Sequence, residues 1–428
     1  MKVIVNPSRK IFGKVKVPGD KSISHRLAIL GAISTGETII RRFSSSSDCL
    51  STVSCLRQLG VQIESSGPDC LTIVGQGLRG LEHAHQPLDA GNSGTTIRLL
   101  SGILGGQDFL TTITGDKSLK QRPMKRIIEP LSQMGVRIGA NKGSTAPLTI
   151  WGGNLHPIDY LIPVPSAQVK SAILLAGLYA QGMTQIRELV STRNHTEIAL
   201  QEFGVNLKIS GEILRIQGGQ QPQGLEITVP GDISSAAFFV AATLLLPNSE
   251  TLIEQVSLNP GRRAILDVLI EMGASIEILQ QKKIFGESVG NIKVHSSDLK
   301  GGSLSGSLIP QIIDEIPVLA VLATQTQKGL TIRDADELKI KESNRIRTLV
   351  DNLRAIGAKV EEYPDGMFIP GQQILKGGVV NSYGDHRIAM AFAIAGLTAS
   401  EPTYIENGRC ADVSFPGFYD LLKQLTTE

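Results

Sequence analysis

The sequence predicts an α/β protein made of two similar domains, each built from three repeats. Three observations lead to this prediction. The chain has 428 residues, more than one compact hydrophobic core usually accommodates. One apolar segment recurs six times along the chain, and a second motif that contains glycine follows it at regular intervals. Recurrence over the whole length indicates a repeat architecture.

The first recurring segment is an apolar helical run followed by a polar or glycine turn and the start of a strand. Its copies end in aligned isoleucines that lie 67 to 79 residues apart. A run that is apolar on all sides predicts a helix that is buried on all sides. The six isoleucines are Ile40, Ile113, Ile186, Ile253, Ile332 and Ile405.

The second motif, L-x-x-[LMFI]-G-[VA], is typical of the end of an amphipathic helix, with glycine just beyond the last turn. Its glycines are Gly60, Gly135, Gly204, Gly273 and Gly357. The sixth copy is truncated, and residues 419–425 (YDLLKQL) are expected to close the chain as a helix. Each repeat therefore consists of a strand, a buried helix, a strand, a partly exposed helix and further strands. Six such units in two groups of three give two similar α/β domains.

A polar segment lies directly before each buried helix. Helix capping alone would explain any one of these segments. Six in register, with lysine, arginine and histidine among them, instead predict clustered anion-binding sites, because helix starts offer free N–H groups and the positive dipole end. We expect substrates with several negative groups. The segments are PGDKSISHR (18–26), GNSGTTIR (91–98), PVPSAQVKS (163–171), PGDISSA (230–236), QIIDEIP (311–317) and YGDHR (383–387).

Composition limits the possible partners and locations. The formal net charge is only +2, so a broad nucleic-acid surface is not expected. No apolar run reaches the length of a membrane span, and the start of the chain lacks the apolar core of a signal peptide. We therefore expect a cytoplasmic protein. The chain contains neither a P-loop nor a dinucleotide motif, and its cysteines and histidines lack metal-ligand spacing. We expect neither a cofactor nor a metal ion.

At these segments the sequence resembles the 5-enolpyruvylshikimate-3-phosphate synthases, and in particular their second class. The resemblance covers the whole chain. It implies the enolpyruvyl transferase fold, an inside-out α/β barrel in which each domain has three βαβαββ units. Residues 1–18 and 231–428 would form one discontinuous domain, residues 19–230 the inserted domain, and the active site the cleft between them. Ten motifs carry the resemblance, in the family's order: PGDKSISHR, NSGTTIR, GDKSLKQRPM, PVPSAQVKSA, STRNHTE, PGDISSAA, IIDEIPVLA, LKIKESNRI, YGDHRIAM and SFPGFYDLL.

The same resemblance implies transfer of the enolpyruvyl group of phosphoenolpyruvate to the 5-hydroxyl of shikimate 3-phosphate, and it assigns site residues by position. Shikimate 3-phosphate would contact Lys21, Ser22, Arg26, Ser166, Ala167, Gln168, Arg193, Asp314 and Lys341. Phosphoenolpyruvate would contact Lys21, Asn92, Gly94, Thr95, Arg122, Gln168, Arg345 and Arg387. The positions closest to the chemistry would be Lys21, Asp314, Glu342 and His386.

Addition of the sugar hydroxyl followed by elimination of phosphate requires a base and an acid. We expect Asp314 to be the base that accepts the hydroxyl proton. The neighbouring Glu315 is the alternative, because the sequence does not fix which side chain faces the substrates. We expect Glu342 to protonate the C3 atom of phosphoenolpyruvate, with Lys21 as the alternative acid.

Two other functions remain open at the level of sequence. An enolpyruvyl transferase acting on UDP-N-acetylglucosamine would share the sixfold fold. It would carry a GxKN-type first loop and a reactive cysteine in a mobile loop, whereas residues 105–125 contain no cysteine. A non-catalytic anion-binding protein would have little use for paired acids such as Asp314 and Glu342. We also expect a monomer, with glyphosate as an inhibitor.

Overall fold

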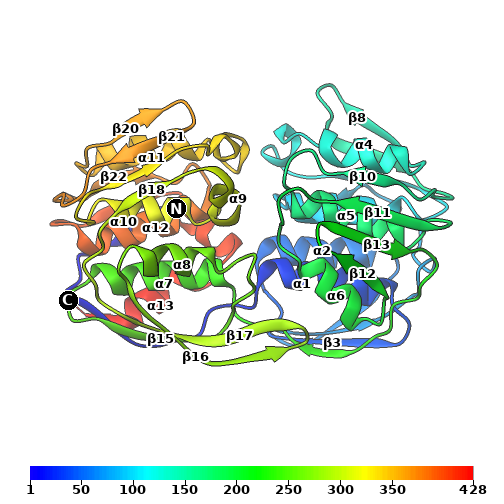
Figure 1. The fold of residues 1–428 in the computed structure, drawn as a ribbon, viewed down its shortest axis with the longest axis horizontal. Helices are drawn as coiled ribbons and strands as arrows, with labels where there is room; N and C mark the ends of the chain where they lie inside the picture. Colours follow the sequence, from blue (N-terminus) through cyan, green and yellow to red (C-terminus); the bar gives the residue numbers. More distant parts are fainter. Residues whose placement is uncertain (428) are drawn as a thin grey trace. The chain divides into compact units, whose positions relative to one another are not determined.

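The computed structural model describes residues 1–427, which divide into two compact units (Figure 1). Unit 1 contains Met1–Pro18, Pro230–Lys282 and the described residues from Ser288 onward, and unit 2 contains Gly19–Val229 and Lys283–Glu287. The structure differs from the predicted division at Pro230 and at residues 283–287, which change units. Residues 283–287 belong to unit 2 because Phe285 packs against the hydrophobic core of that unit.

Unit 2 contains six α-helices and three four-stranded sheets. The helices are α1 (Lys21–Ile33), α2 (Ser47–Gln58), α3 (Gly94–Leu104), α4 (Lys125–Gln133), α5 (Ala167–Gly177) and α6 (His195–Glu202). The first sheet has the order β14 (Glu226–Thr228), β3 (Glu37–Arg41), β5 (Cys70–Val74) and β4 (Gln62–Gly67). The second has the order β6 (Leu88–Asp89), β7 (Leu110–Thr114), β9 (Thr145–Trp151) and β8 (Arg137–Asn141). The third has the order β10 (Asp159–Leu161), β11 (Met183–Arg187), β13 (Ile213–Gln217) and β12 (Leu207–Ser210).

Unit 1 repeats this arrangement. Its helices are α7 (Ile233–Leu245), α8 (Ala264–Glu271), α9 (Ile309–Ile312), α10 (Ile316–Ala323), α11 (Arg345–Ala355), α12 (His386–Thr398) and α13 (Phe418–Leu425). One sheet has the order β16 (Ser275–Ile284), β17 (Glu287–His295), β15 (Glu250–Ser257), β2 (Lys10–Val15) and β24 (Thr426–Thr427). A second sheet has the order β18 (Gly302–Leu304), β19 (Leu330–Ile332), β21 (Gly366–Ile369) and β20 (Glu361–Tyr363). A third has the order β1 (Val3–Val5), β23 (Thr403–Glu406) and β22 (Gly378–Asn381).

The six aligned isoleucines occupy equivalent positions in the six sheets, which confirms the predicted repeats and fold class. Each lies fully buried in the strand that follows the first helix of its repeat. That strand pairs in parallel with one neighbour and antiparallel with the other. For example, β3 is parallel to β14 and antiparallel to β5, and β19 is parallel to β18 and antiparallel to β21. In the truncated sixth repeat β1 supplies the antiparallel partner of β23, with Val3 opposite Ile405.

The glycines of the second motif end the second helices as predicted. All five have positive φ angles, between +81° and +103°, a region that residues with a Cβ atom rarely adopt. The second helices are partly exposed; α4, for example, buries only Ile127, Pro130 and Leu131. The predicted closing helix is present as α13.

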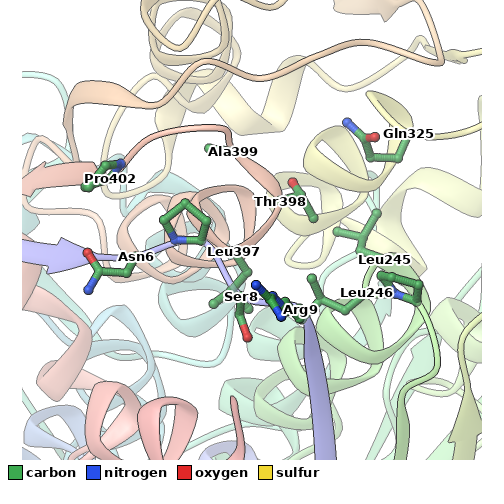
Figure 2. A pocket seen from close by; sticks show the side chains of 12 residues that line it. Asn6, Ser8, Arg9, Leu245, Leu246, Gln325, Leu397, Thr398, Ala399 and Pro402 are labelled. Carbon is green, nitrogen blue, oxygen red and sulfur yellow. The ribbon is translucent and has the colours of Figure 1, made fainter. Parts of the chain in front are cut away.

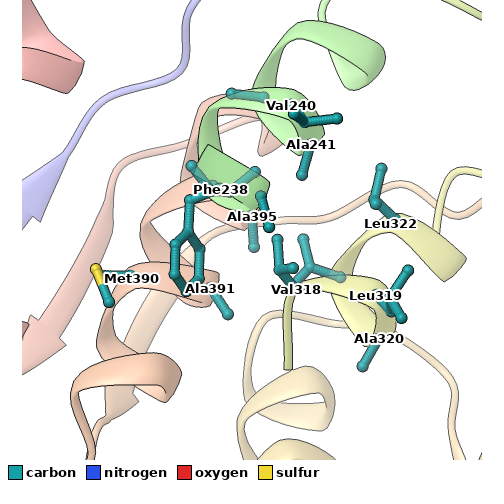
Figure 3. Packing of buried hydrophobic residues seen from close by; sticks show 14 of the residues in the cluster. Phe238, Val240, Ala241, Val318, Leu319, Ala320, Leu322, Met390, Ala391 and Ala395 are labelled. Atoms are coloured by element: carbon teal, nitrogen blue, oxygen red, sulfur yellow. The ribbon is translucent and has the colours of Figure 1, made fainter. Parts of the chain in front are cut away.

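The first helices form the interior of each unit. In unit 1, α7, α10 and α12 contact one another, and every residue of α10 is buried. Figure 3 shows Phe238 and Ala241 of α7 near Val318 of α10 and Ala391 of α12. Such helices expose almost no side surface, so only their ends are available for polar contacts. Among the described helices, none is by itself long and apolar enough to cross a membrane.

Contacts at and near their first turns show that the starts of these helices meet inside each unit. In unit 2, Arg26 of α1 donates to Ser171 of α5 at 2.9 Å, and Gln168 of α5 donates to Thr95 of α3 at 2.9 Å. In unit 1, Ser234 of α7 donates to Glu315, which precedes α10. Arg387 of α12 donates to the carbonyl oxygen of Asp314, again beside α10, at 2.8 Å. Each unit therefore gathers three helix starts.

A buried polar chain fixes this arrangement in unit 2. His25 Nδ1 lies 2.7 Å from Thr52 Oγ1, which lies 2.7 Å from Thr96 Oγ1. Thr96 in turn donates to Ser93, the N-cap of α3, at 2.7 Å. Burial lowers the pKa of His25 to about 3, so the imidazole is neutral near pH 7.

We predict that His25 makes the protein less stable as the pH falls from 7 to 5. The unfolded chain binds a proton at His25 below about pH 6.5, while the folded protein does not bind it until about pH 3. Between pH 7 and 5 the wild type should lose about 2 kcal/mol more unfolding free energy than the variant His25→Asn. Urea titrations at both pH values measure this. Equal losses in the two proteins would contradict the assignment.

Candidate active site

The anion-binding segments predicted from sequence cap and begin the first helices. Side chains of Asp20, Ser93, Ser166, Asp232 and Asp385 accept hydrogen bonds from backbone N–H groups of the first turns. We had expected these segments to lie before the helices, whereas several predicted ligands lie in the first turns themselves. Those ligands include Lys21, Ser22, Gly94, Thr95, Ala167, Gln168, His386 and Arg387, and Arg26 lies in the second turn of α1. A helix start can hold a capping residue and a ligand-binding residue together, because capping uses only one short side chain per helix.

Arg26 is a buried cation whose direct partners are neutral. Its guanidinium donates to Thr196 Oγ1 at 2.6 Å, to the Ser22 carbonyl oxygen at 2.8 Å and to Ser171 Oγ at 2.9 Å. Burial lowers the pKa of Arg26 to about 10, partly offset by nearby Glu197, so the group stays charged near pH 7. The charge of Arg193 also lowers this pKa, which places a second cation nearby. Two cations at the meeting of helix starts suit a phosphate group.

Gln168 and Asn92 connect the other predicted ligands of unit 2. Gln168 Oε1 accepts a bond from Arg98 Nη1 at 2.7 Å, beside its own bond to Thr95. The side-chain oxygen of Asn92 accepts a bond from Arg122 Nη2 at 2.7 Å. Arg122 is mostly buried, so its guanidinium is held in one place.

Gly94 lies beside two guanidinium groups. A Cβ atom at Gly94 would come within 2.6 Å of Arg98 Nη1 and 3.5 Å of Arg122 Nη1. The missing side chain therefore allows the Arg98 guanidinium to lie directly against the start of α3.

Lys21 is paired with an acid that the sequence analysis did not select. Its Nζ atom lies 2.7 Å from Asp48 Oδ2, and both side chains are mostly but not fully buried. Asp48 lies in the first turn of α2. The pair holds the ammonium group of the lysine in one direction at the start of α1.

In unit 1, Asp314 is surrounded by three cations. Its carboxylate lies 3.7 Å from Arg345 Nη1, 3.8 Å from Lys341 Nζ and 3.8 Å from Arg262 Nη1. The segment QIIDEIP is not an open loop, because α9 ends at Ile312 and α10 begins at Ile316. Asp314 therefore occupies a short connection in which its direction is fixed.

Glu315 has a different environment from Asp314. Its side chain is 1% exposed, accepts a hydrogen bond from Ser234, and lies 3.7 Å from Arg387 Nη1 and 3.9 Å from Arg262 Nη2. The Asp314 side chain is 16% exposed. Of the two acids, Asp314 is therefore the more accessible one.

Arg345 of unit 1 is paired with three carboxylates, those of Asp314, Glu342 and Asp385. Its guanidinium donates to Asp385 at 2.8 Å and to Glu342 at 2.6 Å. Burial lowers the pKa of Arg345, but the surrounding carboxylates outweigh burial and raise it above its ordinary value. Asp385 is fully buried and also caps α12, so Arg345 is fixed to the start of that helix. His386, the first residue of α12, is buried as well.

The predicted site residues fall into two groups, one in each unit. Unit 2 holds Lys21, Ser22, Arg26, Asn92, Gly94, Thr95, Arg122, Ser166, Ala167, Gln168 and Arg193. Unit 1 holds Asp314, Lys341, Glu342, Arg345, His386 and Arg387. Sequence reasoning missed the residues that orient these side chains. They are Asp48, Arg98, Ser171, Thr196, Arg262 and Asp385.

Some of the missed residues had a usable signal. Arg98, Ser171 and Asp385 lie within the segments that we selected, close to the starts of α3, α5 and α12, and this position could have marked them. Arg262 and Asp48 lie outside every selected segment. Their partners are distant in the sequence, so local pattern gave no indication of them.

A hollow of about 650 Å³ lies in unit 1 at the other ends of the first helices (Figure 2). Leu245 ends α7, Thr398 ends α12, and Gln325 follows α10 closely. None of the predicted site residues lines this hollow. Among the described residues, no group of histidines, cysteines and acids is arranged to hold a metal ion.

The chain is similar over almost its whole length to known proteins of one family. The family model described as EPSP synthase (3-phosphoshikimate 1-carboxyvinyltransferase) matches residues 5–422. A 3-phosphoshikimate 1-carboxyvinyltransferase of Desulforamulus reducens is 51% identical, with 100% of both chains covered. One of Brevibacillus brevis is 50% identical over 99% of both chains. A solved EPSP synthase structure from Acinetobacter baumannii has a TM-score of 0.89 at 39% identity, covering 99% of this chain and 98% of its own. The chain belongs to the EPSP synthase family.

Proposed function

We propose that the protein transfers the enolpyruvyl group of phosphoenolpyruvate to the 5-hydroxyl of shikimate 3-phosphate and releases phosphate. The observation that carries this proposal is that, within each unit, residues assigned by the family resemblance lie at a cluster of helix starts. A partly exposed carboxylate among three cations, Asp314, provides a base. Buried arginines with fixed directions provide anion binding. The whole-chain family match supports this reaction over transfer to UDP-N-acetylglucosamine and over a non-catalytic role.

Shikimate 3-phosphate binds mainly to unit 2 in this proposal. Arg26 and Arg193 bind its phosphate, since two neighbouring cations at helix starts match a dianion. Ser166 and Gln168 at the start of α5 contact the ring. We propose that Asp314 and Lys341 contact the hydroxyl groups and that Asp314 is the base for the reacting hydroxyl.

Phosphoenolpyruvate binds at the start of α3 and at the arginines of unit 1. Asn92 and Arg122 take its charged groups, and Gly94 leaves space for them. Arg345 and Arg387 supply further fixed cations. Removing one such contact to the developing charge typically costs about 10² to 10³ in rate.

The reaction proceeds in two steps. In the first, Asp314 accepts the proton of the 5-hydroxyl as its oxygen bonds to C2 of phosphoenolpyruvate, and an acid protonates C3. In the second, the conjugate base of that acid takes a proton from C3, the bond between C2 and the phosphate oxygen breaks, and phosphate leaves. Glu342 is the proposed acid, although its 2.6 Å contact with Arg345 favours the ionised form until a substrate displaces that contact. Lys21, paired with Asp48, is the alternative acid.

A direct assay tests this function. The purified protein is mixed with phosphoenolpyruvate and, in turn, with shikimate 3-phosphate or UDP-N-acetylglucosamine, and phosphate release is followed. We expect release only with shikimate 3-phosphate. Inhibition by glyphosate, a monomeric state and a cytoplasmic location are part of the same proposal. Inhibition assays, sedimentation and cell fractionation test them.

We predict that Lys21→Ala and Asp314→Ala each lower turnover at least about 10²-fold while the protein stays folded, because each removes a charged group at the reacting atoms. Steady-state phosphate release measures this. The exposed residues Lys14 and Asp336 serve as matched controls, and their alanine variants should keep wild-type turnover. Near-normal turnover in either test variant would reject its assignment.

We predict that Gly94→Ala raises the KM for phosphoenolpyruvate and the inhibition constant of glyphosate, each about tenfold or more. The added methyl group would lie 2.6 Å from Arg98 Nη1 and take up ligand space. Gly153→Ala is the control, because nothing lies within 4 Å of a Cβ atom there. Unchanged constants in Gly94→Ala would show that the ligand does not bind at this helix start.

A further inference from the structure

The loop Glu188–Asn194, here called the Arg193 loop, joins β11 to α6. A buried cluster of charged side chains contacts this loop. Lys170 of α5 is 1% exposed, and its Nζ atom lies 2.7 Å from Glu188 Oε2 and 2.6 Å from Glu197 Oε1. It also donates to the carbonyl oxygen of Thr192 at 3.4 Å. The cluster therefore contacts the chain on both sides of Arg193. Burying a lysine between two carboxylates is costly unless the geometry is good, and these contacts are short.

A second buried contact holds the start of α6. Glu287 Oε1 lies 2.6 Å from Nδ1 of His195, the first residue of α6. Both side chains are almost fully buried. Glu287 begins β17, 92 residues further along the chain, and belongs to the segment Lys283–Glu287 that joins unit 2. A Cβ atom at Gly286 would lie 2.8 Å from Ile198 Cγ2, so glycine permits this close approach to α6.

The start of α6 is in turn part of the Arg26 contacts. Thr196 Oγ1 accepts from Arg26 Nε at 2.6 Å and lies 2.6 Å from Ser171 Oγ. Arg26 and Arg193 repel each other, since the charge of Arg193 lowers the pKa of Arg26. The charges of Glu197 and Glu287 act in the opposite direction on the same group. The two carboxylates that hold the loop and the start of α6 thus also offset the repulsion between the two arginines.

We propose that Glu287 and Lys170 are positioning residues that keep Arg193 and Arg26 directed at the phosphate of the acceptor. The inference rests on the proposed function, because it takes the acceptor to be shikimate 3-phosphate. Neither residue touches the substrate. Each acts through α6 or the Arg193 loop, so its loss should weaken binding of the phosphate group and spare binding of the ring.

Charge and position have opposite effects here, which makes the inference testable. If Glu287 acted only as a negative charge, its removal would increase the positive potential and tighten phosphate binding. If it positions α6 through His195, losing the hydrogen bond weakens phosphate binding. Glu287→Gln keeps an oxygen that can accept the bond from His195 but removes the charge, and Glu287→Ala removes both.

The experiment measures calorimetric dissociation constants of shikimate 3-phosphate and of shikimate, which lacks the phosphate, for the full-length protein. In Glu287→Ala we expect the constant for shikimate 3-phosphate to rise about tenfold, the scale of one lost hydrogen bond to a charged group. The constant for shikimate should stay within about twofold, and Glu287→Gln should remain within about threefold of wild type for both. Glu226→Ala, which breaks an exposed ion pair with Arg41 in the same unit, is the control and should change neither.

Two further variants keep the test decisive if Glu287→Ala does not fold, as judged by circular dichroism. Gly286→Ala shifts the same segment without removing a charge. Lys170→Gln loosens the Arg193 loop from the other side. Both should reduce the preference for shikimate 3-phosphate over shikimate.

The inference is overturned by tighter binding of shikimate 3-phosphate in Glu287→Ala, by equal weakening of both ligands, or by an unchanged preference in all variants. Absence of a preference for the phosphorylated ligand in the wild type would overturn it as well. Because binding is measured without turnover, failure of the proposed reaction shows separately as absent phosphate release.

Discussion

The structure depends on the burial of six first helices that can make polar contacts only at their ends. A helix that is apolar on all sides excludes water along its length, and its first N–H groups still need partners. Three such helices in each unit begin close together, as the contacts between Arg26 and Ser171 and between Ser234 and Glu315 show. Positive helix ends, short capping side chains and cations are thereby concentrated in a small volume of each unit. Anion chemistry follows from this constraint.

Concentrated cations repel one another, and the protein offsets this with carboxylates. Lys21 pairs with Asp48, and Arg345 pairs with Asp385 and Glu342. Arg26 differs because its direct partners are neutral oxygen atoms. A cation with neutral partners attracts a ligand anion most strongly, whereas a paired cation first has to exchange its partner.

Much of the fold was predictable because its signals are local. The isoleucine in each repeat specifies a buried strand position, and the glycine after each second helix is required by a positive φ angle. The capping residues Asp20 and Ser166 likewise act within one turn of their helices. The position of residues 283–287 in unit 2 was not predictable. It depends on tertiary contacts, because Phe285 packs against the hydrophobic core of unit 2 and Glu287 contacts His195 of α6.

The sequence by itself determined the repeats, the buried and exposed helices, the polar segments at the helix starts and the family resemblance. These depend on periodicity and on residue types within a few positions of each other. Only the tertiary structure decided that Asp314 is accessible while its neighbour Glu315 is buried, and that Arg262 lies beside both. It also decided which charges pair, because such pairs join residues far apart in the chain whose distances are set by packing.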